Sequence, residues 1–151
     1  MNILLPLLQK KVSELEQKGV DIILVMYKGN MSALVSRKPL FIPHRVFTGA
    51  IGWMQPKGPV GIICPVEGQR RAAEKKWREA GFDPVVLIAS PFCDTDMREA
   101  GFKLQNKALD MVIIDCYGHG EMGKKELTEM LRCPVISMRS MVVKILSEIL
   151  G

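Results

Sequence analysis

Asp110-Met-Val-Ile-Ile-Asp-Cys-Tyr-Gly-His-Gly120 is the stretch of this chain that decides the fold. Its continuous run of branched apolar residues is typical of a parallel strand that is buried on both faces. The run ends at Asp115 and Cys116 and then passes through two glycines into a sequence with helical spacing. Because ligands of open α/β sheets bind outside the carboxyl ends of the strands, this stretch predicts an α/β fold and also the place of a site.

Cys116 has two interpretations. In the functional one, the free N–H groups at the start of the following helix favour negative charge, and therefore favour a thiolate over a thiol. In the structural one, Cys116 is a small apolar residue that closes the strand, because free cysteine is among the most buried residue types. The local sequence leaves both interpretations open.

The pattern of an apolar strand followed by a helix repeats along the chain. Apolar residues recur every three or four positions near the start, where Gly19 can end the helix, and Gly81 can end a charged helix further on. The predicted strands are 20–26, 59–64, 84–89, 110–115 and 134–138. The predicted helices are 4–18, 43–53, 68–80, one around 97–104, one around 127–131, and a last one that Ser140 caps. Such alternation predicts an α/β fold of parallel sheets with helices on both faces.

Composition excludes several classes of protein. The net charge of +5 over 151 residues comes from scattered basic residues without interleaved aromatics, so nucleic-acid binding is not expected. The four cysteines lie far apart with no Cys-x-x-Cys pair, which excludes the usual zinc spacings and a small disulfide framework, and we expect no metal. Reduced thiols, no signal peptide and no membrane-spanning run predict a cytoplasmic protein.

Gly118, Gly120 and Gly123 match the G-x-G-x-x-G pattern of dinucleotide-binding loops. The next predicted strand ends at Met138 and Arg139, without the acidic residue that would bind the ribose hydroxyls. Too few residues follow Gly123 for the strands that a nucleotide domain needs. We therefore expect no cofactor.

A series of segments stands in a specific order along the chain: Leu7-Leu-Gln-Lys-Lys-Val12, Gly19-Val-Asp-Ile-Ile-Leu24, Arg37-Lys-Pro-Leu-Phe-Ile-Pro43, Val60-Gly-Ile-Ile-Cys-Pro-Val-Glu67, Ala89-Ser-Pro91, the Asp115-Cys116 turn and Cys133-Pro-Val-Ile136. In this order the chain resembles the AroM family, within the aspartate/glutamate/hydantoin racemase superfamily, over nearly its whole length. The superfamily implies two Rossmann-like α/β lobes of the Asp/Glu racemase type, with a small carboxylate-bearing ligand between them. Carried over here, residues 1–55 form a partial first lobe, on which helix 139–151 packs back, and residues 56–138 form the second lobe.

The resemblance also implies a site. In the superfamily a cysteine at a strand end in each lobe serves as acid or base without a cofactor, and Cys116 corresponds to the cysteine of the second lobe. Backbone amides after the strands hold the ligand carboxylate, as helix N-termini do. His119 would orient or deprotonate Cys116, although a histidine at a helix start is more often simply solvated. The implied catalytic residues are Cys116 and His119, and the implied ligand-binding residues are Tyr27, Lys28, Gly29, Asn30, Ser90, Tyr117 and Gly118.

One departure from the family pattern affects the expected chemistry. Tyr27-Lys28-Gly29 stands where similar chains have Cys-Thr-Gly, so the first thiol is missing. A tyrosine holds its proton at neutral pH and is a poor base, so racemisation by two thiols is not expected. This leaves a racemase-, isomerase- or decarboxylase-like reaction that uses one thiol on a small carboxylate. The alternative is a non-catalytic small-ligand-binding protein with a degenerate racemase site.

A second departure concerns the N-terminal part of the family pattern, which we expect this chain to lack. A first lobe with so few strands would leave a sheet edge and an apolar face uncovered. We therefore expect a homodimer that covers this face.

Overall fold

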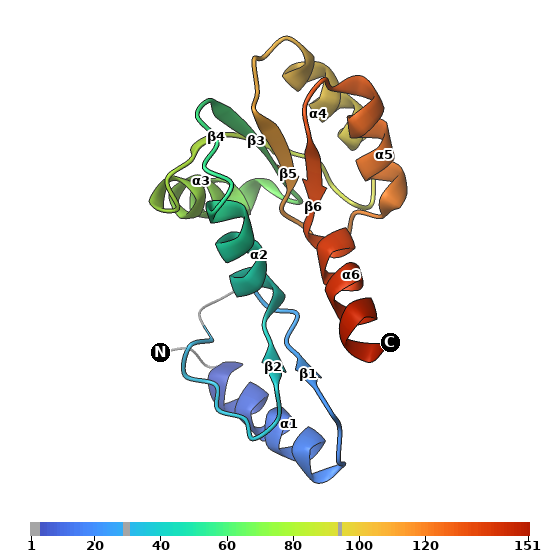
Figure 1. Ribbon diagram of the computed structural model, residues 1–151. Helices are drawn as coiled ribbons and strands as arrows, with labels where there is room; N and C mark the ends of the chain where they lie inside the picture. The colour runs from blue at the N-terminus through green and yellow to red at the C-terminus, as the bar shows by residue number, and fades with distance from the viewer. Residues whose placement is uncertain (1–3, 29–30, 94) are drawn as a thin grey trace. The chain divides into compact units, whose positions relative to one another are not determined.

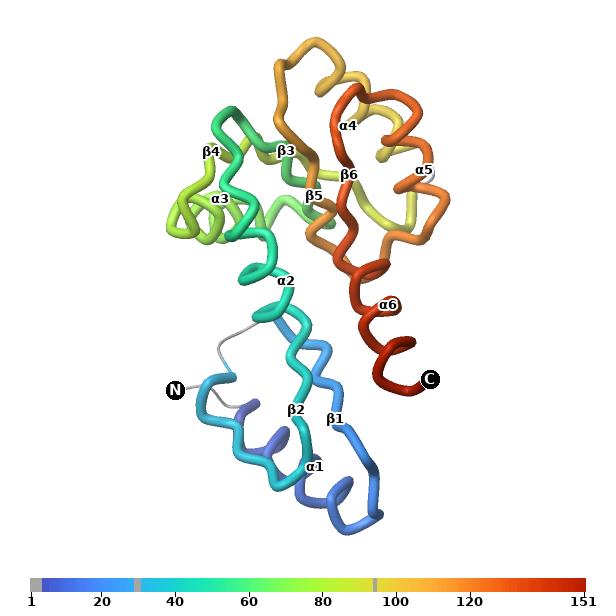
Figure 2. The backbone as a smooth tube through the Cα atoms, viewed as in Figure 1, coloured from blue at the N-terminus to red at the C-terminus, as the bar shows by residue number. Residues whose placement is uncertain are grey.

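The computed structural model describes residues 4–28, 31–93 and 95–151 (Figures 1 and 2). The described residues form two compact units that divide between Val46 and Phe47. This division lies inside α2 (Pro43–Gly52), whose Phe47 and Ile51 belong to the core of the second unit. The lobe boundaries expected from the sequence, with helix 139–151 packing back on the first lobe, stay predictions.

The first unit is a helix on a small parallel sheet. Helix α1 (Leu4–Gln17) is followed by Gly19 at a φ of 76°, a left-handed conformation in which glycine is favoured. Strand β1 (Ile23–Leu24) pairs in parallel with β2 (Leu40–Phe41). The core of this unit consists of buried apolar side chains from α1, both strands and the connection between them: Val12, Ile23, Val25, Met31, Leu34 and Ile42.

Side chains of α1 form hydrogen bonds with the long connection between the two strands. The Gln9 amide donates to the carbonyl of Val35 (2.8 Å) and accepts from its N–H (2.9 Å). The Glu16 carboxylate accepts from the Ser36 hydroxyl (2.8 Å) and from the N–H of Arg37. Residues 35–37 of the connection are therefore held along the helix.

The second unit is a four-stranded parallel sheet in the order β4-β3-β5-β6. The sheet confirms the α/β fold with parallel strands that the sequence predicts. Its elements are β3 (Pro59–Cys64), a 3-10 turn η1 (Glu67–Gln69), α3 (Arg70–Glu79), β4 (Asp83–Ile88), α4 (Asp96–Gln105), β5 (Met111–Ile114), α5 (Glu121–Met130), β6 (Val135–Ser137) and α6 (Met138–Leu150). Figure 1 shows α4 and α5 together on one side of this sheet and α3 on the other.

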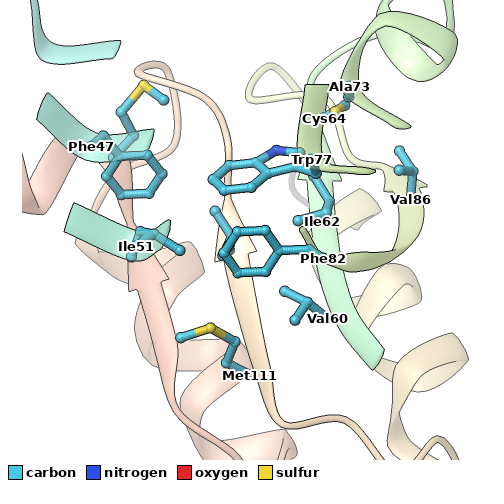
Figure 3. Packing of buried hydrophobic residues seen from close by; sticks show 12 residues of the cluster. Phe47, Ile51, Val60, Ile62, Cys64, Ala73, Trp77, Phe82, Val86 and Met111 are labelled. Carbon is cyan, nitrogen blue, oxygen red and sulfur yellow. The ribbon is translucent and has the colours of Figure 1, made fainter. Parts of the chain in front are cut away.

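Helices cover both faces of the four-stranded sheet, as the apolar runs in its strands predict. On the α3 face, Trp77 is completely buried and packs edge-to-face against Phe82 (5.3 Å between ring centres) and Phe47 (6.2 Å) (Figure 3). On the other face, α4 and α5 bury Leu104 and Leu127 against alternate residues of the same strands. The sheet is thus the middle layer of three.

The two ends of the chain differ in detail from the sequence prediction. Strand β2 was not predicted, and strand 20–26 is reduced to Ile23–Leu24. The last helix begins at Met138 rather than after Ser140, because the Ser137 hydroxyl accepts from the N–H of Ser140 and caps it. No helix in the described part of the chain combines the length and apolarity needed to cross a bilayer.

Candidate functional site

The site lies where the chain reverses its direction of travel across the four-stranded sheet. From β3 the chain moves outward to β4, and then returns past β3 to β5 and β6. The carboxyl ends of β3 and β5 therefore form the topological switch point, which is the usual ligand position in open α/β sheets. Backbone bonds from Asp115 N–H to Ile63 (2.9 Å) and from Ala89 N–H to Cys64 (2.9 Å) hold the turns after β5 and β4 at this edge.

Cys116 is buried in the turn after β5, with 6% of its surface exposed, and its side chain belongs to the apolar cluster on the α4–α5 face. Its sulfur accepts a hydrogen bond from the N–H of Gly118 (3.2 Å). Cys116 therefore lies just after the end of a buried parallel strand, as the sequence predicts. The surrounding turn buries the thiol, so Cys116 is not exposed at the surface.

Gly118 is required by close packing. A Cβ atom at this position would stand 2.8 Å from Cγ of Pro91 and 3.5 Å from the Cys116 sulfur. The first glycine of the G-x-G-x-x-G pattern thus has a packing cause, which is the approach of the β4–α4 loop to the β5–α5 turn. Pro91 and Gly118 together form the wall beside the thiol.

His119 is buried with 6% exposure, and its ring Nε2 lies 2.9 Å from the carbonyl oxygen of Ala89. Because a carbonyl oxygen only accepts, Nε2 carries the proton in this bond. In the neutral ring, Nδ1 is then an acceptor. Burial lowers the pKa of His119, while the Ala89 bond and the charge of Asp96 oppose that shift, so the neutral ring is favoured.

A groove of about 570 Å³ opens between α4 and α5, beside His119. Two of the predicted residues, Ser90 and His119, line it. Around them lie the apolar Pro91, Met97 and Met122, together with Cys93, Arg98, Gly120, Gly123, Lys125, Glu126 and Glu129. The charges facing this groove are paired, since Arg98 bonds to Glu126 (2.7 Å) and Lys125 lies 3.8 Å from Glu129.

Asp96 fixes the Ser90 turn on one wall of the groove. It lies in the first turn of α4, and its carboxylate accepts from the N–H of Ser90 (2.9 Å). Hydrogen bonds from Cys93 and from the Ser90 N–H lower the pKa of Asp96. The Ser90 hydroxyl oxygen in turn accepts from Phe92 N–H (3.2 Å), which leaves its proton to donate. Ser90 was predicted as a ligand-binding residue, whereas Asp96 was not predicted as part of the site.

A second polar cluster lies on the opposite face of the sheet, at the residue that precedes Cys116. The Asp115 carboxylate accepts hydrogen bonds from the ammonium of Lys76 and from Nε1 of Trp77 (3.1 Å). Lys76 Nζ also lies 4.4 Å from the centre of the Trp77 ring. Because neighbouring side chains point to opposite faces, this cluster anchors the turn from the α3 side while Cys116 faces α4 and α5. Asp115 and Lys76 were not predicted as site residues, and their separation in sequence gave no signal.

The remaining predicted residues divide between the two units. Tyr117 is half-buried and packs against the α3-face cluster. Tyr27 and Lys28 are half-buried in the first unit, just after β1, where the N–H of Tyr27 donates to the carbonyl of Val25 (2.9 Å). Gly29 and Asn30 lie outside the described residues. Ser90, Cys116, Gly118 and His119 thus lie on the α4–α5 side of the second unit, and Tyr117 lies on its α3 side.

No cluster of three or more histidine, cysteine or acidic side chains that could hold a metal occurs among the residues that the structure describes. All four thiols are free, and Cys93 is the exposed one. Groups at this edge that can take part in chemistry include the Cys116 thiol, the His119 ring and the Ser90 hydroxyl.

Comparison with known families gives one match. The family model described as AroM protein covers residues 2–150 of this chain. Among curated proteins, the chain finds no match.

Proposed function

Because this chain belongs to the AroM family, we propose that it binds a small carboxylate-bearing ligand at the carboxyl edge of β5, and that Cys116 exchanges a proton with the carbon beside that carboxylate. The observation that carries the proposal is the hydrogen bond from Gly118 N–H to the Cys116 sulfur at the switch point. This bond fixes the sulfur at the carboxyl end of β5, the edge at which ligands of open α/β sheets bind. Helix α5 begins a few residues later, and its N-cap Gly120 makes no side-chain cap bond, so first-turn amides are available for a ligand anion.

The proposed step uses one thiol. The Cys116 thiolate takes the proton from the carbon and becomes a thiol, while the C–H electron pair passes into the carboxylate to form an enediolate. The thiol then returns a proton to the same face of that carbon. Where the carbon carries a second carboxylate, loss of CO₂ leaves the electron pair on the carbon, and the same thiol protonates it.

This step predicts hydrogen exchange with retention of configuration. The test is proton NMR in D₂O with a panel of enantiopure amino acids, hydroxy acids and substituted malonates. Deuterium should enter beside the carboxylate of at least one compound without inversion, and Cys116→Ser should slow the exchange by about 10²-fold or more. Cys133→Ser, which changes a half-buried thiol remote from the turn, is the matched control and should keep the wild-type rate. An unchanged rate in Cys116→Ser would contradict the proposal.

A second candidate function is binding without chemistry. The observation that favours it is the burial of Cys116, whose sulfur is satisfied within its own turn. In this case the same panel produces thermal shifts in wild-type protein and in Cys116→Ser alike, and no compound exchanges deuterium. Ligand-induced shifts together with Cys116-dependent exchange would reject this candidate in favour of the first.

A further inference from the structure

We propose that the groove between α4 and α5 selects carboxylates that carry a hydroxyl group on the adjacent carbon, with His119 Nδ1 and the Ser90 hydroxyl as the groups that recognise this hydroxyl. The inference rests on the proposed function, in that it takes a small carboxylate as the ligand of this edge. It adds the chemical class of that ligand.

A hydrogen bond to the residue after β4 holds the ring of His119. Ala89 is the first residue after β4, and its carbonyl oxygen holds Nε2 of His119 at 2.9 Å. This bond sets the tautomer, because the carbonyl cannot donate. The lone pair of Nδ1 is thereby left for a partner. Among the described residues, His119 makes no second hydrogen bond.

The position of the ring makes this acceptor available to a ligand. His119 lines the groove although 94% of its surface is covered, and an atom at the Cβ position of Gly123 would be 3.9 Å from Nδ1. Nδ1 thus faces the first turn of α5. Because His119 lines the groove, a ligand hydroxyl can take the place of water as the donor to Nδ1.

Ser90 supplies the complementary group on the same groove. Its backbone is fixed by Asp96, and its hydroxyl oxygen already accepts from Phe92, so the hydroxyl proton is the part left to donate. One acceptor and one donor match a hydroxyl group, which donates one hydrogen bond and accepts another. An ammonium group only donates, and a methylene does neither.

The charged side chains of the groove do not separate one small acid from another, because they are paired with each other. Arg98 is bonded to Glu126 and Lys125 lies near Glu129, so selection between similar acids falls to the neutral polar groups. The apolar side chains of Met97 and Met122 on the lining suit the carbon skeleton of a small acid. A small hydroxy acid therefore fits both the polar and the apolar parts of the lining.

The test compares three dicarboxylates of equal length, L-malate, succinate and L-aspartate, by calorimetric or NMR titration at pH 7.5. Wild-type protein should bind malate at least about tenfold more tightly than succinate and more tightly than aspartate. His119→Phe and Ser90→Ala should each bring the malate-to-succinate ratio close to one, because each removes a group that bonds to the hydroxyl of malate. Thr128→Val, which removes an exposed hydroxyl from α5, is the control and should keep the wild-type ratio.

Each other result would overturn the inference: equal affinity for malate and succinate in wild type, tighter binding of aspartate, a ratio that survives His119→Phe, or no binding of any of the three. Nitrogen NMR gives a second measurement that needs no variant of Ser90 or His119. The His119 ring should be protonated at Nε2, and malate but not succinate should shift the Nδ1 resonance. The chain has two histidines, so His44→Gln completes the assignment.

The hydroxyl selectivity and the proton transfer by Cys116 can each be rejected without rejecting the other. Hydroxyl selectivity without Cys116-dependent exchange would retain the inference and reject the proton transfer. Exchange on succinate and malate at equal rates, with equal affinities, would retain the proton transfer and reject the inference.

Discussion

Nε1 of Trp77 donates a hydrogen bond to the carboxylate of Asp115 over 3.1 Å, and so joins the body of α3 to the residue that precedes Cys116. The same carboxylate pairs with Lys76, whose side chain is 22% exposed against 3% for Asp115. An acidic group at such depth is stable only with these donors, because a buried charge without partners carries a large desolvation cost. The position of the thiol turn thus depends on contacts from a helix about forty residues earlier in the chain.

Lys76→Met should destabilise the protein by roughly 2–4 kcal/mol, since it leaves the Asp115 charge buried with one donor fewer. The control is Lys75→Met on the same helix. Lys75 lies 3.8 Å from Glu79 in an exposed pair, and its loss should change stability by less than about 0.5 kcal/mol. Urea unfolding at pH 7 measures both values. Equal effects of the two substitutions would contradict a stabilising role for the buried pair.

Stability should fall with decreasing pH in a way that depends on His119. Burial lowers its pKa below the ordinary value of 6.5, so at a pH between the folded and the unfolded pKa the unfolded chain binds more protons. The contribution of the neutral ring is therefore complete above pH 6.5 and is lost as the pH falls through the folded pKa. Unfolding free energies at pH 7.5, 6.5 and 5.5 should show a steeper loss for wild type than for His119→Gln. Parallel curves would argue against a buried neutral ring.

Gly118→Ala should destabilise the protein by about 1–3 kcal/mol, because the added methyl group would meet the rigid ring of Pro91 at 2.8 Å. Gly68→Ala is the matched control, since a Cβ atom there meets nothing within 4 Å. Thermal unfolding of both variants measures the difference. If Gly118→Ala were as stable as wild type, Pro91 would be able to move away from the added methyl group, and close packing at Gly118 would not be required.

The four thiols should react with iodoacetamide in the order of their exposure. Cys93 is exposed and should react first, Cys133 is half-buried, and Cys116 and Cys64 should react slowly. Peptide mass spectrometry after timed labelling gives the four rates. If Cys116 reacted fastest despite its 6% exposure, the order predicted from exposure would be wrong, and the turn around its sulfur would have to open to the reagent.

We expect the chain to sediment as a dimer at micromolar concentration. The sheet of the first unit has two short strands, and apolar side chains stand exposed on that unit, with Leu7 at 60% and Met26 at 50%. Leu7→Glu combined with Met26→Glu should shift the equilibrium toward monomer. Val35→Glu changes another exposed apolar residue of the same unit and should leave it unchanged. A wild-type protein that sediments as a stable monomer would refute the dimer.

Much of the second unit could be predicted because its signals are local. The run 59–64 was predicted as a strand and is one, and Gly81, with a φ of 89°, follows the charged helix that it was expected to end. Strand β2 gave no such signal, because Leu40 and Phe41 stand between Pro39 and Pro43 and become a strand by pairing with β1. The start of α6 was misplaced for a similar reason. Ser137 and Ser140 are both acceptable caps, and the Ser140 hydroxyl is instead bonded to Glu121 of α5 (2.5 Å).

The sequence by itself determined the class of fold, most of the elements and the position of Cys116 at a strand end. These follow from the spacing of apolar residues, from glycine and proline, and from the order of short segments, all of which act over a few positions. Only the tertiary structure decided that Asp115 faces Lys76 and Trp77 while Cys116 faces the opposite helices, that Gly118 is held against Pro91, and that the proton of His119 lies on Nε2. Each of these depends on a partner distant in the chain, because the order of strands in the sheet selects which turns meet.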